Sequence, residues 1–244
     1  MFLIEFLPNI NVFLLSVGIT HNTPRKITNE DIAAQAIVFF TAGSDTVASM
    51  MSFLSYELAT NPDAQEKLRK EIVENSEKCK GKITYEALLK MKYMDMVISE
   101  TLRKWPNVLA TDRVCTKPYT IKPAVPGEKP VHLEKGTALF LPTFSIHRDP
   151  RYFPHPERFD PERFNDENKK NINPYTYFPF GVGPRTCIGS RFALLETKVV
   201  FFHLLSHFKL VPIERTMIPI QISRKSLSVS FDNGLWIGLK RCRE

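Results

Sequence analysis

The segment Phe180-Gly-Val-Gly-Pro-Arg-Thr-Cys-Ile-Gly189 decides the fold of this chain, because it places one cysteine between a glycine-rich loop and an apolar, helix-like segment. Backbone N–H groups and the positive end of a helix dipole favour an ionised sulfur, which binds metals or attacks electrophiles. An arginine two residues before the cysteine acts in the same direction. Gly181, Gly183 and Gly189 permit positive φ angles, so a flat cofactor can lie against the loop. The segment predicts a thiolate site at Cys187.

The composition is that of one globular domain: 244 residues, 43% hydrophobic and 24% charged. The four cysteines, at positions 79, 115, 187 and 242, form no CxxC pair, so we expect neither a disulfide framework nor a zinc site. A reducing compartment fits this pattern. The formal charge of +7 is compatible with a solvated basic surface or with a docking face for an acidic partner. We expect no nucleic-acid partner.

The first 18 residues are apolar but carry Glu5, Pro8, Asn9 and Asn11 and lack a basic leading region. They make a poor signal peptide and fall short of the ~20 apolar residues that span a bilayer. We expect residues 1–26 to form a buried or orphaned segment, with the domain proper at 27–244.

Thr28 and Asp31 have the spacing of a helix capping box. The helix that starts there is predicted to reach about Ala59 and, being apolar on most faces, to cross the middle of the domain. Asn61-Pro62 ends it and starts an amphipathic helix over 63–80.

The long helix contains Ala42-Gly-Ser-Asp-Thr46, whose residues are mostly mediocre helix formers. Their clustering predicts a local distortion, although small side chains at a helix–helix contact are the commoner reason for such a sequence.

Glu100 and Arg103 stand three residues apart on one face of a helix that stops at Pro106. Alone, such a pair is a weak signal, since exposed pairs contribute only ~0–1 kcal/mol. A Pro-rich stretch with two Pro-Glu-Arg-Phe copies follows, at 156–159 and 161–164.

Short strands are predicted over 119–121, 131–133 and 137–141, as a small sheet. An apolar helix is expected over 188–208. The tail over 213–243 reads as strands with a turn at Asp232-Asn-Gly234, since Asn-Gly is a strong hairpin signal.

The run from Pro179 to Arg191 resembles the haem-binding loop of the cytochrome P450 family. The order of the motifs supports this resemblance: a central helix with Ala42–Thr46, an ExxR helix, a Pro-Glu-Arg-Phe meander and the cysteine loop. The resemblance covers about residues 27–243, and the amino-acid sequence looks most like that of insect microsomal members. It implies a mainly α fold with small β-sheets, the C-terminal portion of the P450 fold, ending in a β-hairpin.

The resemblance assigns a role to each candidate residue. Cys187 is implied as the axial thiolate of haem b iron, which favours O–O cleavage, and Phe180 as a shield for its sulfur. Thr46 would hydrogen-bond dioxygen, and Asp45 would relay protons. The remaining cofactor-binding candidates are Arg185 and Arg113 for the two haem propionates, and Gly181 and Ala42 for close approach of the haem.

In the family, the ExxR residues and the meander arginine form a buried network, here Glu100, Arg103 and Arg163. The Arg163 copy of the tetrapeptide fits the usual order better than the Arg158 copy. These are implied as structural residues. Breaking such a network costs ~3–5 kcal/mol.

The resemblance further implies a monooxygenase that inserts one oxygen atom into apolar small molecules. Electrons would come from NADPH through NADPH-cytochrome P450 reductase, with cytochrome b5 as a further candidate partner. Phe39, Phe40 and the segments 108–111 and 226–229 would line the substrate pocket. The protein would act at the cytosolic face of the endoplasmic reticulum membrane, anchored through an N-terminal part.

Family members are roughly twice as long as this chain, so we expect a fragment, a splice form or an incomplete gene model that lacks the N-terminal half. Two alternatives stay open. One is an inactive or non-catalytic haem-binding module, against which the intact 42–46 motif counts. The other is a cysteine nucleophile enzyme that uses Cys187. It requires a base, and the nearest histidines, at 147, 155, 203 and 207, share no motif with the cysteine.

Overall fold

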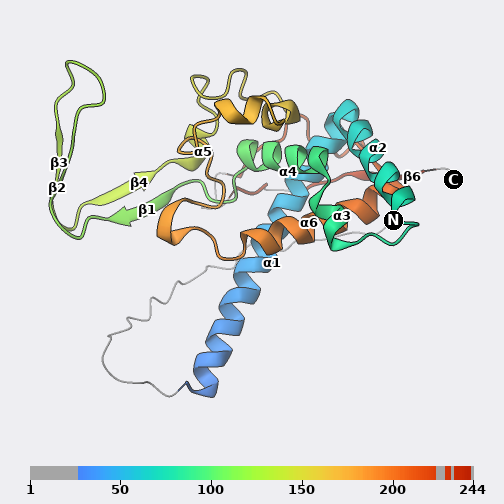
Figure 1. Ribbon diagram of the computed structural model, residues 1–244, viewed down its shortest axis with the longest axis horizontal. Coiled ribbons are helices and arrows are strands. Elements are labelled where there is room, and N and C mark those ends of the chain that lie inside the picture. The colour runs from blue at the N-terminus through green and yellow to red at the C-terminus, as the bar shows by residue number, and fades with distance from the viewer. Residues whose placement is uncertain (1–26, 224–228, 232–233, 243–244) are drawn as a thin grey trace.

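The computed structural model describes residues 27–223, 229–231 and 234–242. These residues form a mainly helical body with three separate two-stranded antiparallel sheets (Figure 1). The predicted fold class, mainly α with small sheets, is therefore confirmed. The N-terminal segment 1–26 lies outside the described residues.

Helix α1 spans Asn29–Thr60 and begins at the predicted capping box. The Thr28 hydroxyl accepts a hydrogen bond from Asp31 N–H, and the Asp31 carboxylate accepts one from Thr28 N–H at 3.0 Å. Residues 42–46 are α-helical without a break, so the distortion predicted there is wrong. The Thr46 hydroxyl is satisfied within the helix, where it donates to the Ala42 carbonyl at 2.7 Å.

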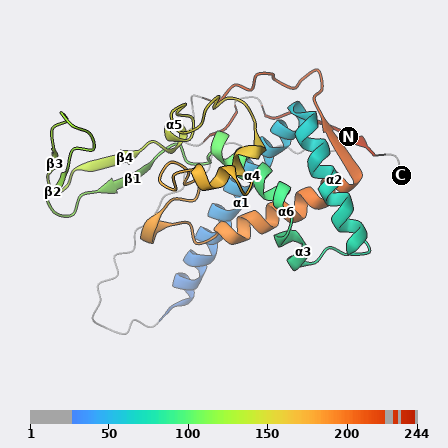
Figure 2. The ribbon, with the colours of Figure 1, turned by 45° about the horizontal axis from the view of Figure 1, so that its top comes forward.

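Only the second half of α1 is a core helix. Its buried residues begin at Val47, whereas the turns before it expose Ile37 by 64% and Phe40 by 76%. In Figures 1 and 2 this first half projects away from the other helices. The expectation that the whole helix crosses the domain is wrong. An apolar sequence does not show which part of a helix is packed against other elements. By length and composition alone α1 is able to cross a membrane.

Three further helices pack against the buried half of α1: α2 Pro62–Lys78, α4 Lys92–Lys104 and α6 Ser190–His207. The short helix α3 Tyr85–Leu89 packs against α6. Helix α6 crosses α1 in both ribbon views. One apolar core joins these helices, with Leu58, Ile72, Met94 and Leu205 fully buried in it. Helix α2 starts with Pro62 at its first position, and α4 ends before Pro106, both as predicted.

Strands β1 Thr111–Val114 and β4 Ala138–Leu141 pair with each other, and β2 Tyr119–Ile121 pairs with β3 Val131–Leu133. The predicted strands are thus present, but they belong to two sheets instead of one. Together they form an arm that extends from the helical body (Figure 1). The short helix α5 Thr143–Ile146 leads from β4 back to the body.

The meander contains the 3-10 helices η1 Pro161–Phe164 and η2 Asn168–Asn171, and a third, η3 Gly183–Arg185, lies in the cysteine loop. Strand β5 Phe208–Val211 follows α6 directly and pairs with β6 Gly238–Arg241. Residues 232 and 233 of the predicted hairpin turn lie outside the described residues. Of the strands predicted over 213–243, the described residues contain β6.

Candidate functional site

The cysteine loop is closed by backbone hydrogen bonds. Cys187 N–H donates to the Phe180 carbonyl at 2.9 Å, and Gly181 N–H donates to the Phe178 carbonyl at 2.9 Å. Gly181 and Gly183 both adopt φ +77°, as predicted, whereas Gly189 has φ −87° and caps α6. Positive φ is therefore required on the loop side of the cysteine and not on its helix side. Cys187 is a free, exposed thiol three residues before α6 begins.

Exposed apolar side chains follow the cysteine and recur on the first half of α1. Ile188 is 84% exposed and Phe192 68%. On α1, Phe39 is 56% exposed and Phe40 76%. Exposed patches of this kind mark interaction or ligand-binding surfaces. Phe180 is different, since it is half-buried and packs against the main core, which anchors the start of the loop.

Thr46 and Asp45 lie on the exposed part of α1, just before its buried half. The structure brings Asn107 to them, since Asn107 Nδ2 donates to the Thr46 carbonyl at 3.0 Å. This bond fixes the segment that follows α4 against residues 42–46 of α1. Sequence reasoning missed Asn107, because nothing local marks a contact between residues 61 positions apart.

The two arginines implied as propionate ligands, Arg113 and Arg185, are both exposed. Arg113 lies on β1 and donates to the carbonyl of its neighbour Asp112 at 2.6 Å. Arg185 ends the 3-10 helix η3. Within the described residues neither guanidinium forms an ion pair with an acidic side chain, so both are available to an external carboxylate.

The predicted ExxR network is confirmed. Glu100 and Arg103 are completely buried and pair through Arg103 Nε and Glu100 Oε2 at 2.7 Å. Arg163 joins through its Nε, 3.4 Å from Glu100 Oε1. Arg158 of the other tetrapeptide contributes only its carbonyl, 3.5 Å from Arg103 Nη2. Burial raises the pKa of Glu100, and the hydrogen bonds and charge of Arg103 act against that shift.

His147 is a second buried group that sequence reasoning missed as a structural element. Its carbonyl accepts from Arg103 Nη1 at 2.9 Å, and its Nε2 accepts from Phe178 N–H at 3.0 Å. Burial lowers the pKa of His147 to about 4. The available signal was its place in His147-Arg-Asp-Pro150, just before the meander.

Among the described residues, no histidine is placed as a base for a nucleophilic Cys187. His147 is committed to Phe178, and His155, His203 and His207 are exposed. In the part of the chain that the structure describes, no hydrogen bond of Cys187 involves a histidine. The cysteine nucleophile alternative therefore gains no support.

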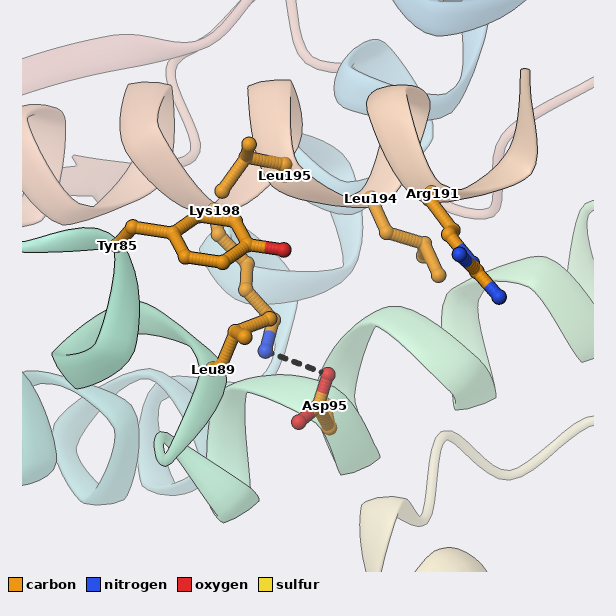
Figure 3. A pocket seen from close by; sticks show the side chains of 7 residues that line it. All are labelled: Tyr85, Leu89, Asp95, Arg191, Leu194, Leu195 and Lys198. Atoms are coloured by element: carbon orange, nitrogen blue, oxygen red, sulfur yellow. Dashed lines mark ion pairs between the residues drawn. The ribbon is translucent and has the colours of Figure 1, made fainter.

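A cavity of about 350 Å³ lies between α3, α4 and α6 (Figure 3). Tyr85, Leu89 and Leu195 line it, with Arg191 at the edge nearest the start of α6. Lys198 points into it but pairs with Asp95 at 2.7 Å and donates to the Leu88 carbonyl at 3.0 Å. Its buried ammonium group thus has partners in the fold and serves packing between helices.

Comparison with known proteins gives one family. A family model described as Cytochrome P450 matches residues 7–234. Cytochrome P450 9e2 of Blattella germanica is 50% identical over 215 residues, which are 88% of this chain and 40% of that protein. Probable cytochrome P450 9f2 of Drosophila melanogaster is 47% identical over 88% of this chain and 41% of its own length. Cytochrome P450 3A29 of Sus scrofa is 44% identical over 84% and 39%, respectively.

The chain spans about two fifths of the length of these curated relatives. The match covers the α1 helix, the buried ExxR network, the meander and the closed cysteine loop, which are the elements that the sequence motifs predicted. The likeness to insect members is confirmed by the cockroach and fly relatives. This chain therefore belongs to the cytochrome P450 family.

Proposed function

We propose that residues 27–244 supply the thiolate side and part of the oxygen-binding side of a haem-thiolate monooxygenase. The closed loop that presents Cys187, exposed and with its backbone N–H fixed on Phe180, is the observation that carries the proposal. Membership of the P450 family supports the same reaction class. In the sequence, the ExxR network and the loop occur together, as this function requires.

The residues fit a flat, apolar, dianionic group such as haem b. The free Cys187 sulfur is a soft ligand suited to iron. Ile188 and Phe192 offer exposed apolar surface beside it, and Arg113 and Arg185 offer two guanidinium groups for two carboxylates. Gly181 has φ +77°, a backbone conformation that residues with a side chain rarely adopt, so a substitution there would strain the loop.

When bound, the haem would supply the redox chemistry that activates dioxygen. The chain's own residues would prepare the site. Cys187 would ligate the iron, Phe180 would shield the sulfur, and Ala42 would leave room on the α1 side. The Thr46 hydroxyl donates its proton to the Ala42 carbonyl, so its oxygen would accept a hydrogen bond from a proton donor on the oxygen-binding side, and Asp45 would exchange protons with solvent.

The finer parts of the proposal follow the family. Electrons would come from NADPH through NADPH-cytochrome P450 reductase, with cytochrome b5 as a second donor. The substrate would be a lipophilic small molecule that contacts Phe39, Phe40 and residues 108–111. The protein would work at the cytosolic face of the endoplasmic reticulum membrane. Of the segment 226–229 only Val229 is described, and it is buried with Phe53 and Trp105.

A non-catalytic haem-binding module is the second candidate. Thr46 and Asp45 are exposed, so within the described residues the oxygen-binding side is open to water. Catalysis requires that water be excluded from such a site. Binding of haem without turnover would favour this candidate.

The test is a carbon monoxide difference spectrum of the reduced, haem-reconstituted chain. A strongly red-shifted Soret band is expected for the natural chain, and its loss for Cys187→Ser, because a hydroxyl stays protonated and ligates iron poorly. Cys79→Ser, at the end of α2, is the matched control and retains the band. A normal band in Cys187→Ser would refute the ligand assignment. Absence of the band in the natural chain would refute the proposal for this polypeptide.

A further inference from the structure

Arg103 of the buried ExxR network and Cys187 of the closed loop are 84 positions apart in the sequence, and His147 contacts both the network and the segment that enters the loop. We infer that His147 is a positioning residue, which transfers the rigidity of the Glu100–Arg103 pair to the loop that carries Cys187. The inference rests on the proposed function of that loop.

The first link joins the network to His147. Arg103 is fully buried, with Nε and Nη2 bound to the Glu100 carboxylate. Its remaining Nη1 donates to the His147 carbonyl at 2.9 Å. Because a guanidinium is a rigid planar fork, fixing two nitrogens on Glu100 fixes the direction of the third. The backbone of His147 is therefore held by the network.

The second link joins the His147 ring to the loop. Nε2 accepts from Phe178 N–H at 3.0 Å, so the neutral ring carries its proton on Nδ1. The ring is completely buried and stacks on Tyr177, with centroids 5.4 Å apart and planes at 30°. It therefore has little freedom to release Phe178.

The third link runs within the loop. The Phe178 carbonyl accepts from Gly181 N–H, and the Phe180 carbonyl accepts from Cys187 N–H, both at 2.9 Å. Backbone bonds thus continue from the residue that His147 holds to the residue that presents the sulfur. Moving Phe178 would displace both ends of this closure.

A second anchor on the same segment shows what His147 adds. Tyr177 OH donates to the Ser99 carbonyl at 3.0 Å, which ties the side chain before Phe178 to α4. Among the described contacts, His147 holds the backbone N–H of Phe178 itself. It therefore sets the direction of the peptide plane that enters the loop, which a side-chain anchor at Tyr177 does not.

The experiment measures amide hydrogen exchange in the complete 244-residue chain, without added haem. His147→Leu keeps the volume but removes the acceptor, so we expect roughly tenfold faster exchange over residues 178–187 and unchanged exchange over α2. His147→Gln places an oxygen near the position of Nε2 and is expected to stay within about threefold of the natural chain. His132→Leu, which removes an exposed imidazole on β3, is the control and changes neither region.

If His147→Leu does not fold, the inference is tested by comparing the two amide variants, His147→Gln and His147→Asn. Asn is one methylene shorter than Gln and falls short of Phe178, so His147→Asn should exchange roughly tenfold faster over 178–187 than His147→Gln. Equal exchange in the two amide variants, no change in the leucine variant, or a uniform increase over all helices would each overturn the inference. Failure of the carbon monoxide test in the natural chain would sink the proposed function but leave this measurement intact.

Discussion

Glu100 and Arg103 form an ion pair with no solvent exposure, in which Arg103 Nε and Nη2 lie 2.7 and 2.9 Å from the two carboxylate oxygens. Glu100 also accepts from Asp160 N–H at 2.9 Å, so one carboxylate joins α4 to the meander. Burial of two charges is compensated only while both partners remain.

Arg103→Met is expected to lower the free energy of unfolding by ~3–5 kcal/mol, because it leaves a buried carboxylate without its main partner. Urea denaturation followed by circular dichroism measures this loss. The control is Arg151→Met, which removes an exposed partner of Asp149 and should leave the midpoint unchanged. Equal midpoints for the two variants would contradict the structural role of the network.

Trp105→Phe tests the link between α4 and α1. The Trp105 indole N–H donates to Glu57 Oε1 at 2.7 Å, while its ring stacks on Phe53 with centroids 4.8 Å apart. Phenylalanine keeps the stack and loses the donor, so among the described residues Glu57 retains Lys104 and Asn61 as side-chain partners. We expect a loss of ~1–3 kcal/mol in unfolding free energy, measured in urea. A loss near zero would show that the other two partners suffice.

The helix boundaries could be predicted from the sequence because their causes are local. The Thr28–Asp31 box, Pro62 and Pro106 each act within a turn or two of their own position. The strand pairing of the tail could not be predicted in this way, since β6 pairs with β5 and not with a neighbour in the tail.

The candidate site could be predicted only where short sequence motifs mark it. The loop around Cys187 and the Glu100–Arg103 pair lie in such motifs. Asn107 and His147 are not, because each acts on a backbone group that only the folded chain brings near, at Thr46 and Phe178. Nor could the exposure of Phe40 be predicted, since an apolar residue carries no information on which segment covers it.

The stability of the chain should depend on the protonation of His147. Its pKa is lowered to about 4 by burial, with the Arg103 charge acting in the same direction and the backbone groups of Leu102 and Arg103 against it. In the unfolded chain the ordinary value of 6.5 applies. Between these values the unfolded chain binds more protons, so stability is full above about pH 6.5 and falls as the pH drops toward 4.

This contribution amounts to about 3 kcal/mol over the whole window, and His147→Gln lacks it. We therefore expect unfolding free energies at pH 7.5 and pH 4.5 to differ less in His147→Gln than in the natural chain, in urea at constant ionic strength. Protonation also turns Nε2 into a donor that faces the donor Phe178 N–H. The same pH dependence in both chains would show that His147 is not buried as a neutral ring.

Thr46→Ala tests the oxygen-binding side. Its hydroxyl is exposed and bonds only to the Ala42 carbonyl among the described contacts, so removal should change the unfolding free energy by no more than ~0.5 kcal/mol and leave haem binding intact. Loss of a positioned hydrogen-bonding group should instead impair proton delivery to oxygen. In a chain extended to the length of its relatives and supplied with reductase, we expect more hydrogen peroxide and less product per NADPH consumed.

Thr46→Ser keeps the hydroxyl and should give the same ratio of product to NADPH as the natural chain. If Thr46→Ala matches the natural coupling ratio, the hydroxyl has no part in proton delivery, and Asn107, which holds the Thr46 carbonyl, would then fix only the backbone of the turn.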